Sequence, residues 1–200
     1  MSLFASPDRP EDRHEPLADR MRPRDFDGFF GQVLEFMIDA NRWPPSEIVR
    51  FLTYPFIHGG FTHMLMVVVF LLALGKMVGE VFSPVAVLVV FFASAFVGAL
   101  AFTFLTDDRT PLIGGYPAVY GLIGAFTFIL WVRLGEQGAP QTRAFYLIGF
   151  LLFIQLVFGL LFGAGNDWIA DIAGFATGFV LSFVVSPGGW SRAVARLRAR

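Results

Sequence analysis

Four side chains that could bind a ligand or take part in a reaction stand out among the apolar runs of the chain: His58, His63, Tyr116 and Asp171. Two imidazoles and a carboxylate are possible ligands for a metal ion. The histidines, however, are five residues apart, and on a helix that spacing turns the second side chain well away from the first. We therefore predict no metal and no cofactor, with His58 in a loop and His63 hydrogen-bonded within the fold.

Hydroxyl side chains offer a second kind of chemistry, nucleophilic attack, which needs a hydroxyl exposed beside a base. Ser94 lies near the middle of an apolar run, Ser182 near the end of another, and Thr62 beside His63. None of the three sits in a motif that exposes its hydroxyl beside a base. Cysteine is absent from the chain, which excludes thiolate nucleophiles and cysteine metal sites.

The elements that must position these residues are membrane helices. Hydrophobic residues make up 56% of the chain, and phenylalanine alone accounts for 25 of 200 residues. A helix needs about 20 apolar residues to cross a bilayer. Runs of this kind predict five transmembrane helices, at about 61–78, 81–106, 115–132, 144–163 and 168–185.

Asp171 needs a partner, because a carboxylate in a span costs about 2.5 to 3.5 kcal/mol on insertion and is normally directed inward. We expect a hydrogen-bonded cluster of Tyr116, Asp171 and His63 that joins three helices; a partly solvated Asp171 at the outer interface is the alternative. Small residues on the same faces predict close helix contacts. The glycines expected at these contacts are Gly121, Gly124, Gly174 and Gly178.

The predicted bundle covers residues 61–186 and has three flanking parts. Residues 1–25 are rich in charge and proline, which predicts a disordered polar arm without a signal peptide. Residues 26–60 predict an interfacial amphipathic helix, which ends near Trp43 and the prolines after it, followed by a loop; an ordinary helix packed on the bundle is the alternative. Its apolar side should carry Phe30, Val33, Leu34 and Met37. Residues 187–200 form a basic tail.

Basic residues predict the orientation of the chain. The arginines of the tail indicate a cytoplasmic C-terminus, which places Lys76, Arg133 and Arg143 on the same side, as the positive-inside rule requires. We expect an integral multi-pass protein of a bacterial inner membrane, with the lipid bilayer as a partner and no nucleic-acid partner.

Three segments resemble motifs of the rhomboid family of intramembrane proteases, in family order and spacing. Residues 50–63 are similar to the segment that leads into the family's second transmembrane helix, including its two histidines. Residues 114–125 are similar to the segment that carries the catalytic serine, and residues 170–178 to the histidine-bearing last helix with its two glycines. The resemblance implies an all-α, rhomboid-like helical bundle. The charged arm stands where the family has its first helix. Two explanations are open: the true start of the chain lies upstream, or this variant has five helices.

The resemblance places Tyr116 at the catalytic serine, Pro117 at the glycine after it and Asp171 at the catalytic histidine. His63 matches a histidine that stabilises the oxyanion, whereas Val67 stands at the accompanying asparagine. A phenol beside a carboxylate is a poor nucleophile, since a carboxylate is a weaker base than a neutral imidazole. Removing even one member of a catalytic group leaves only residual catalysis, so the chain is identified as a catalytically degenerate member. The expected remnants of the pocket are His58, His63, Val67 and Tyr120.

Two functions from different classes follow from the resemblance. The first is a pseudoprotease that binds transmembrane segments of client membrane proteins without cleaving them, because binding does not depend on the nucleophile. The second is an active rhomboid-family serine endopeptidase that uses an unrecognised nucleophile. A transporter is disfavoured, because the sequence has no evident internal repeat.

Overall fold

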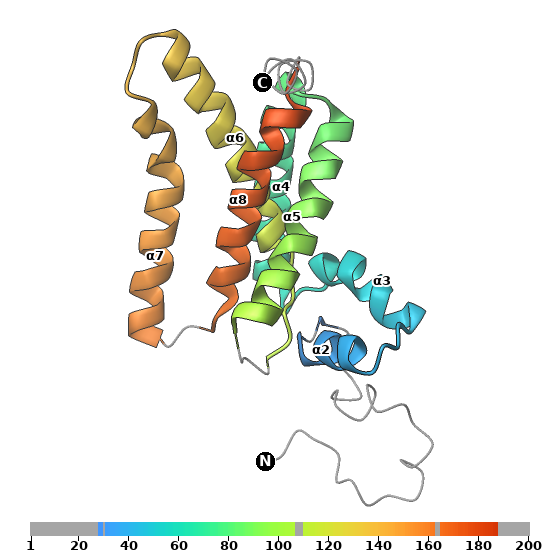
Figure 1. Ribbon diagram of the computed structural model, residues 1–200. Coiled ribbons are helices and arrows are strands. Elements are labelled where there is room, and N and C mark those ends of the chain that lie inside the picture. The colour runs from blue at the N-terminus through green and yellow to red at the C-terminus, as the bar shows by residue number, and fades with distance from the viewer. Residues whose placement is uncertain (1–27, 30, 107–109, 163–164, 188–200) are drawn as a thin grey trace, which may run out of the picture.

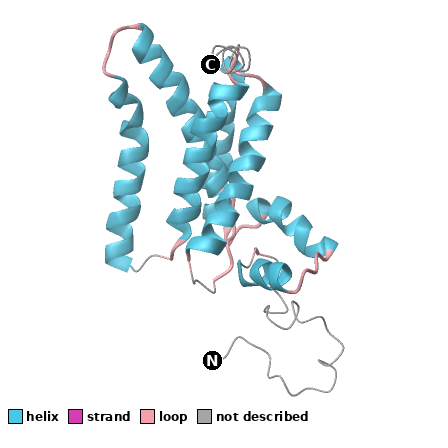
Figure 2. Ribbon diagram, in the orientation of Figure 1, coloured by secondary structure: helices cyan, strands magenta, loops and turns pink. Residues whose placement is uncertain are grey.

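The computed structural model describes residues 28–29, 31–106, 110–162 and 165–187, and the regular structure in these ranges is helical apart from one isolated β-bridge. Figure 2 shows the same helical composition. Five long helices run up and down beside one another (Figure 1). They are α4 (Phe61–Val81), α5 (Pro84–Leu105), α6 (Tyr116–Glu136), α7 (Tyr146–Phe162) and α8 (Asp167–Val185).

Four of these helices, α4, α5, α6 and α8, are long and apolar enough to cross a membrane. Their bounds lie within a few residues of the predicted spans. Helix α7 has 17 residues within the described part of the chain, at the short end of the range of about 17 to 25 for a crossing. It is shorter than predicted because the chain before it forms a separate 3-10 turn, η3 (Gln141–Phe145). The all-α membrane architecture is confirmed, and the fifth crossing stays a prediction.

Serine and proline determine where several helices begin. The Ser83 hydroxyl oxygen accepts a hydrogen bond from the Ala86 amide at 3.1 Å, which satisfies one of the free N–H groups at the start of α5. Pro84 then takes the first helical position, where a missing N–H costs nothing. Pro45 does the same in the short helix α3 (Pro45–Thr53), and Pro117 lies in the first turn of α6.

Helix α6 lies at the centre of the bundle. It packs closely on α5 and α8, contacts α4, and is buried along most of its length. Helix α4 is mostly exposed, with Val67, Leu74 and Val78 buried on one face. The many large apolar side chains exposed on α4, α5 and α7 contact lipid in the membrane, where apolar surface needs no burial within the protein.

Helix α2 (Gly31–Asp39) begins later than predicted. Phe29 forms the isolated bridge with Leu112 instead, through backbone N–H···O bonds of 3.0 and 2.8 Å. Val33, Leu34 and Met37 are buried, as the apolar pattern predicted. Helix α2 packs on α5, so part of its apolar side lies against the bundle, while its placement at the membrane interface stays a prediction.

Helix α3 was not predicted, and residues 41–60 are not simply a loop. The prolines after Trp43 were interpreted as the end of one helix, whereas Pro45 begins the next. Ile48, Val49 and Leu52 of α3 are each about half exposed (46 to 52%), so α3, and not α2, presents an apolar face outward. Phe30, the predicted arm and residues 188–200 of the tail lie outside the described residues.

Helix α7 stands at the edge of the bundle. Figure 1 shows it on the far left, beyond α8 and α6. Its closest backbone packing is with η3. Ile148 at its start is buried against the core, while Phe150 and Phe153 are about 60% exposed. The attachment of the rest of α7 therefore depends on side chains.

Candidate functional site

The first turns of α4 and α6 bring three of the predicted residues together. The His63 and Tyr116 rings are stacked, with centroids 5.0 Å apart and an interplanar angle of 13°. His58 meets His63 edge to face at 5.3 Å, and its Nδ1 donates to the Phe56 carbonyl at 3.0 Å. The two histidines are therefore adjacent despite their spacing, because His58 lies in the loop before α4 and not on the helix. Our spacing argument against a shared site was wrong at this point.

The histidines have unused hydrogen-bonding capacity. Nε2 of both His58 and His63 is buried without a hydrogen-bond partner. The expectation that His63 is a hydrogen-bonded bundle residue is not met at this atom. No ring nitrogen of His58 or His63 bonds a described serine or threonine. The described residues also include no group of three or more His, Cys, Asp or Glu side chains that could hold a metal ion.

Asp171 faces the interior, as expected, with 4% of its surface exposed. Its Oδ2 accepts a hydrogen bond from Nε2 of Gln155 on α7 at 2.8 Å. A direct bond to Tyr116 or His63, the first form of our prediction, is absent from the described contacts; a bond through one water, its second form, stays a prediction. The side-chain amide of Gln155, on α7, bonds to the carboxylate instead. Gln155 was missed, although an amide in the otherwise apolar sequence of α7 was a visible signal.

Tyr54 is a second residue that sequence reasoning missed. It lies in the 3-10 turn η2 (Tyr54–Phe56), is fully buried, and donates its hydroxyl to the Ala95 carbonyl of α5 at 2.7 Å. Burial raises the pKa of Tyr54 above its ordinary value, and the Asp171 carboxylate adds to this effect. The same carboxylate acts electrostatically on the phenols of Tyr116 and Tyr120. The Asp171 carboxylate thus acts on three tyrosines and has no described hydrogen bond to any of them.

The position expected to supply an oxyanion donor, Val67, is apolar. Val67 is buried in a cluster with Tyr120 and Val119, and a Cβ added at Gly115 would lie 3.0 Å from its Cγ1. A valine offers no hydrogen-bond donor. Gly114 has φ of +87°, a conformation that favours glycine, and a Cβ there would collide with the His63 ring.

The four predicted packing glycines lie at close contacts between helices. A Cβ at Gly178 would overlap the Gly121 carbonyl, one at Gly124 the Phe175 carbonyl, and one at Gly174 the Pro117 carbonyl. At Gly121 a Cβ would overlap Ser94 of α5. Helices α6 and α8 therefore touch through their backbones, and this contact fixes Asp171 relative to Tyr116.

The matched region gives the family. The family model for the Rhomboid domain matches residues 45–188, from the start of α3 to beyond the end of α8. The chain belongs to the rhomboid family. This match spans the whole helical bundle, including the histidine loop, the first turn of α6 and the glycines of α8.

Curated relatives agree with the rhomboid assignment. RHOMBOID-like protein 4 of Arabidopsis thaliana is 31% identical over 68% of this chain and 34% of its own length. Inactive RHOMBOID-like protein 8 of the same plant is 32% identical over 54% of this chain and 33% of its own. Rhomboid-like protease 3 of Toxoplasma gondii is 27% identical over 68% of this chain and 51% of its own.

The chain therefore matches only about a third to a half of the length of these relatives. The rhomboid family includes serine proteases and inactive members, and the relatives are named in both ways. They come from organisms as different as Arabidopsis thaliana, Toxoplasma gondii and Bacillus subtilis. They identify an integral multi-pass membrane protein, while the bacterial inner membrane stays a prediction.

Proposed function

We propose that this rhomboid-family chain is a pseudoprotease that binds transmembrane segments of client membrane proteins without cleaving them. The observation that carries the proposal is the environment of Asp171, the residue at the family's histidine position. It is buried and hydrogen-bonded to Gln155. The position that should hold a general base beside the nucleophile is thus occupied by a side chain already engaged in a structural contact.

The chemistry around Tyr116 supports the same conclusion. Covalent catalysis needs a nucleophile in hydrogen-bond contact with a base. The Tyr116 ring instead stacks on His63, and stacking presents the face of an imidazole, not its nitrogen lone pair. Val67 supplies no donor for an oxyanion, and loss of one such donor typically costs about a hundredfold or more in rate.

Client binding needs features that the bundle retains. Helix association in a membrane depends on close packing by small residues and on interhelical hydrogen bonds. The outer faces of α4 and α8 expose large apolar side chains. A transmembrane segment of a client can pack against these faces.

We also propose that the end of the bundle bearing His63 and Tyr116 faces outward and that the basic tail is cytoplasmic. Lys76, Arg133 and Arg143 lie toward the other end of the helices in sequence, which supports the positive-inside orientation. Single cysteines introduced at His58 and Glu136 test it, since the chain has no cysteine of its own. Labelling of His58→Cys by an impermeant thiol reagent from the cytoplasmic side would reverse the assignment.

The deciding experiment measures cleavage and binding together in proteoliposomes with a generic rhomboid substrate. The unmodified chain and Tyr116→Phe should both leave the substrate intact, while a photocrosslinker in the substrate helix captures the chain. The Tyr116→Ser, Asp171→His double variant tests whether the bundle cleaves the substrate once the catalytic serine and histidine of the family are restored. Cleavage by the unmodified chain that persists in Tyr116→Phe would establish the endopeptidase alternative. Absence of both cleavage and capture would reject client binding.

A further inference from the structure

The contact between Asp171 and Gln155 is incomplete if Asp171 is charged. The amide donates from Nε2 to Oδ2 at 2.8 Å, but the amide oxygen Oε1 is buried without any hydrogen-bond partner. A carboxylate can only accept hydrogen bonds. It therefore cannot donate to Oε1, and this amide oxygen is left without a partner in the part-buried contact.

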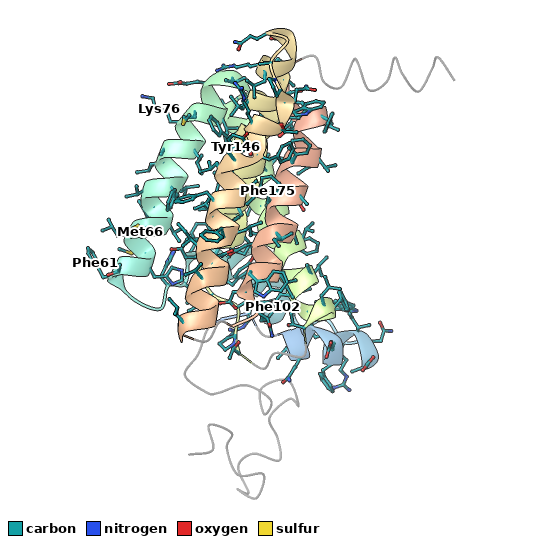
Figure 3. All side chains as sticks on the ribbon, turned by 90° about the vertical axis from the view of Figure 1, so that its left-hand side faces the viewer. Phe61, Met66, Lys76, Phe102, Tyr146 and Phe175 are labelled. Atoms are coloured by element: carbon teal, nitrogen blue, oxygen red, sulfur yellow. The ribbon has the colours of Figure 1, made fainter. Side chains whose placement is uncertain are left out.

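The described surroundings supply no positive charge to offset a buried carboxylate. Lys76 and Arg133 are the cations of the five long helices. Lys76 lies at the end of α4 opposite Phe61 (Figure 3), and Arg133 is in the last turn of α6, whereas Asp171 is in the first turns of α8. Burying an unpaired carboxylate costs far more than burying a hydrogen-bonded neutral acid.

The other groups that face Asp171 are acidic or already engaged. On α8 the neighbouring group is the Asp167 carboxylate, whose negative charge disfavours a charged Asp171. Helix α5 has no titratable residue, and the titratable residue of α7 is Tyr146 at its start. The Tyr54 hydroxyl in η2 donates a hydrogen bond to an α5 carbonyl, and the Tyr116 ring of α6 stacks on His63 of α4. The groups that interact electrostatically with Asp171 are Asp167 on α8, Tyr116 and Tyr120 on α6, and Tyr54 in η2.

We propose that Asp171 is a proton-binding site, in which the neutral carboxyl group and the Gln155 amide form a reciprocal pair. The protonated oxygen of Asp171 donates to Oε1 of Gln155, while the other oxygen accepts from Nε2. The pair then satisfies both side chains with no net charge. Removal of the proton converts one of its two bonds into a repulsion between oxygens.

This pair has a structural consequence for α7. Within the described residues the close backbone packing of α7 is with η3, at the start of the helix, whereas Gln155 lies just beyond the midpoint of α7. The reciprocal pair is the described polar contact that ties this part of α7 to α8. Binding of a proton at Asp171 therefore fastens α7 to the bundle, independently of whether the chain cleaves or binds clients.

Infrared spectroscopy of the unmodified chain in ether-linked lipids tests the proton directly, because these lipids lack ester carbonyls. At about pH 7 ordinary carboxyl groups are ionised, so Asp171 should give a protonated-carboxyl C=O band. Asp171→Asn should remove this band without loss of helical structure. A spectrum in which Asp171→Asn removes no such band would overturn the proposal.

The second measurement follows the position of α7 by spin-label distances. Phe153→Cys on α7 and Val180→Cys on α8 are suitable sites, since both side chains are more than 60% exposed and the chain has no cysteine. Asparagine reproduces the donor and acceptor of the neutral acid, so Asp171→Asn should keep the narrow distance distribution. Asp171→Ala and Gln155→Leu should broaden it. If Asp171→Asn broadens it as much as Asp171→Ala does, the charged form makes the contact and the proposal fails.

Discussion

Replacement of Gly178 by alanine tests whether the backbone contact between α6 and α8 determines the stability of the bundle. The added Cβ would overlap the Gly121 carbonyl and lie 2.7 Å from its Cα. Backbone atoms cannot rotate away, so the helices must separate by on the order of 1 Å, which forfeits up to about half of each dispersion contact across the interface. Overpacking of this kind costs about 3 kcal/mol. The better helix propensity of alanine returns about 1 kcal/mol, which leaves a net loss of about 2 kcal/mol.

Gly149→Ala is the matched control, because it makes the same chemical change in α7, where an added Cβ meets nothing within 4 Å. It should stabilise the chain by up to about 1 kcal/mol, so the two variants should differ by about 3 kcal/mol. Thermal unfolding in detergent micelles, followed by circular dichroism, should show a Tm gap of about 6 to 12 °C. Equal Tm values for Gly178→Ala and Gly149→Ala would refute the claim that the helices touch through their backbones.

Three further predictions use the same unfolding measurement. Tyr54→Phe removes the buried 2.7 Å bond to the Ala95 carbonyl and should cost about 1 to 2 kcal/mol. Burial, and secondly a nearby carboxylate, raise the pKa of Tyr54; stability should therefore fall as the pH rises above about 10, and this fall should be shallower in Tyr54→Phe. Ser83→Ala should cost about 1 kcal/mol by removing the cap of α5, and Ser83→Asp should restore it. Lys76→Ala should change stability by less than about 0.5 kcal/mol, because its 3.9 Å pair with Glu80 is solvent-exposed; a larger loss would contradict the exposed geometry.

Periodicity and apolar length were sufficient to predict the long helices and the packing glycines, because both depend on local sequence. Gly121 and Gly178 stand at helical intervals in apolar runs, and only a close neighbour explains small residues there. The same local reasoning failed for α3, where Pro45 was interpreted as the end of a helix although proline is equally suited to the first helical position.

The contacts of the site were harder to predict, because they depend on which helices become neighbours. His63 was expected to bond Asp171, but it stacks on Tyr116, and Asp171 is reached by Gln155 from α7. No spacing along one helix predicts a bond between two others. A search of each apolar run for its most polar residue would have found Gln155, but it would not have shown that Gln155 bonds Asp171.

The glycine contacts between α6 and α8 separate the architecture of this chain from its chemistry. The two helices are held together by main-chain atoms, which every amino acid possesses, so exchange of Tyr116 or Asp171 leaves the contact unchanged. Mutational drift at the reactive positions therefore leaves this contact intact, whereas a single methyl group at Gly178 does not. A lineage on this scaffold is free to abandon a reaction, keep its shape and acquire another use.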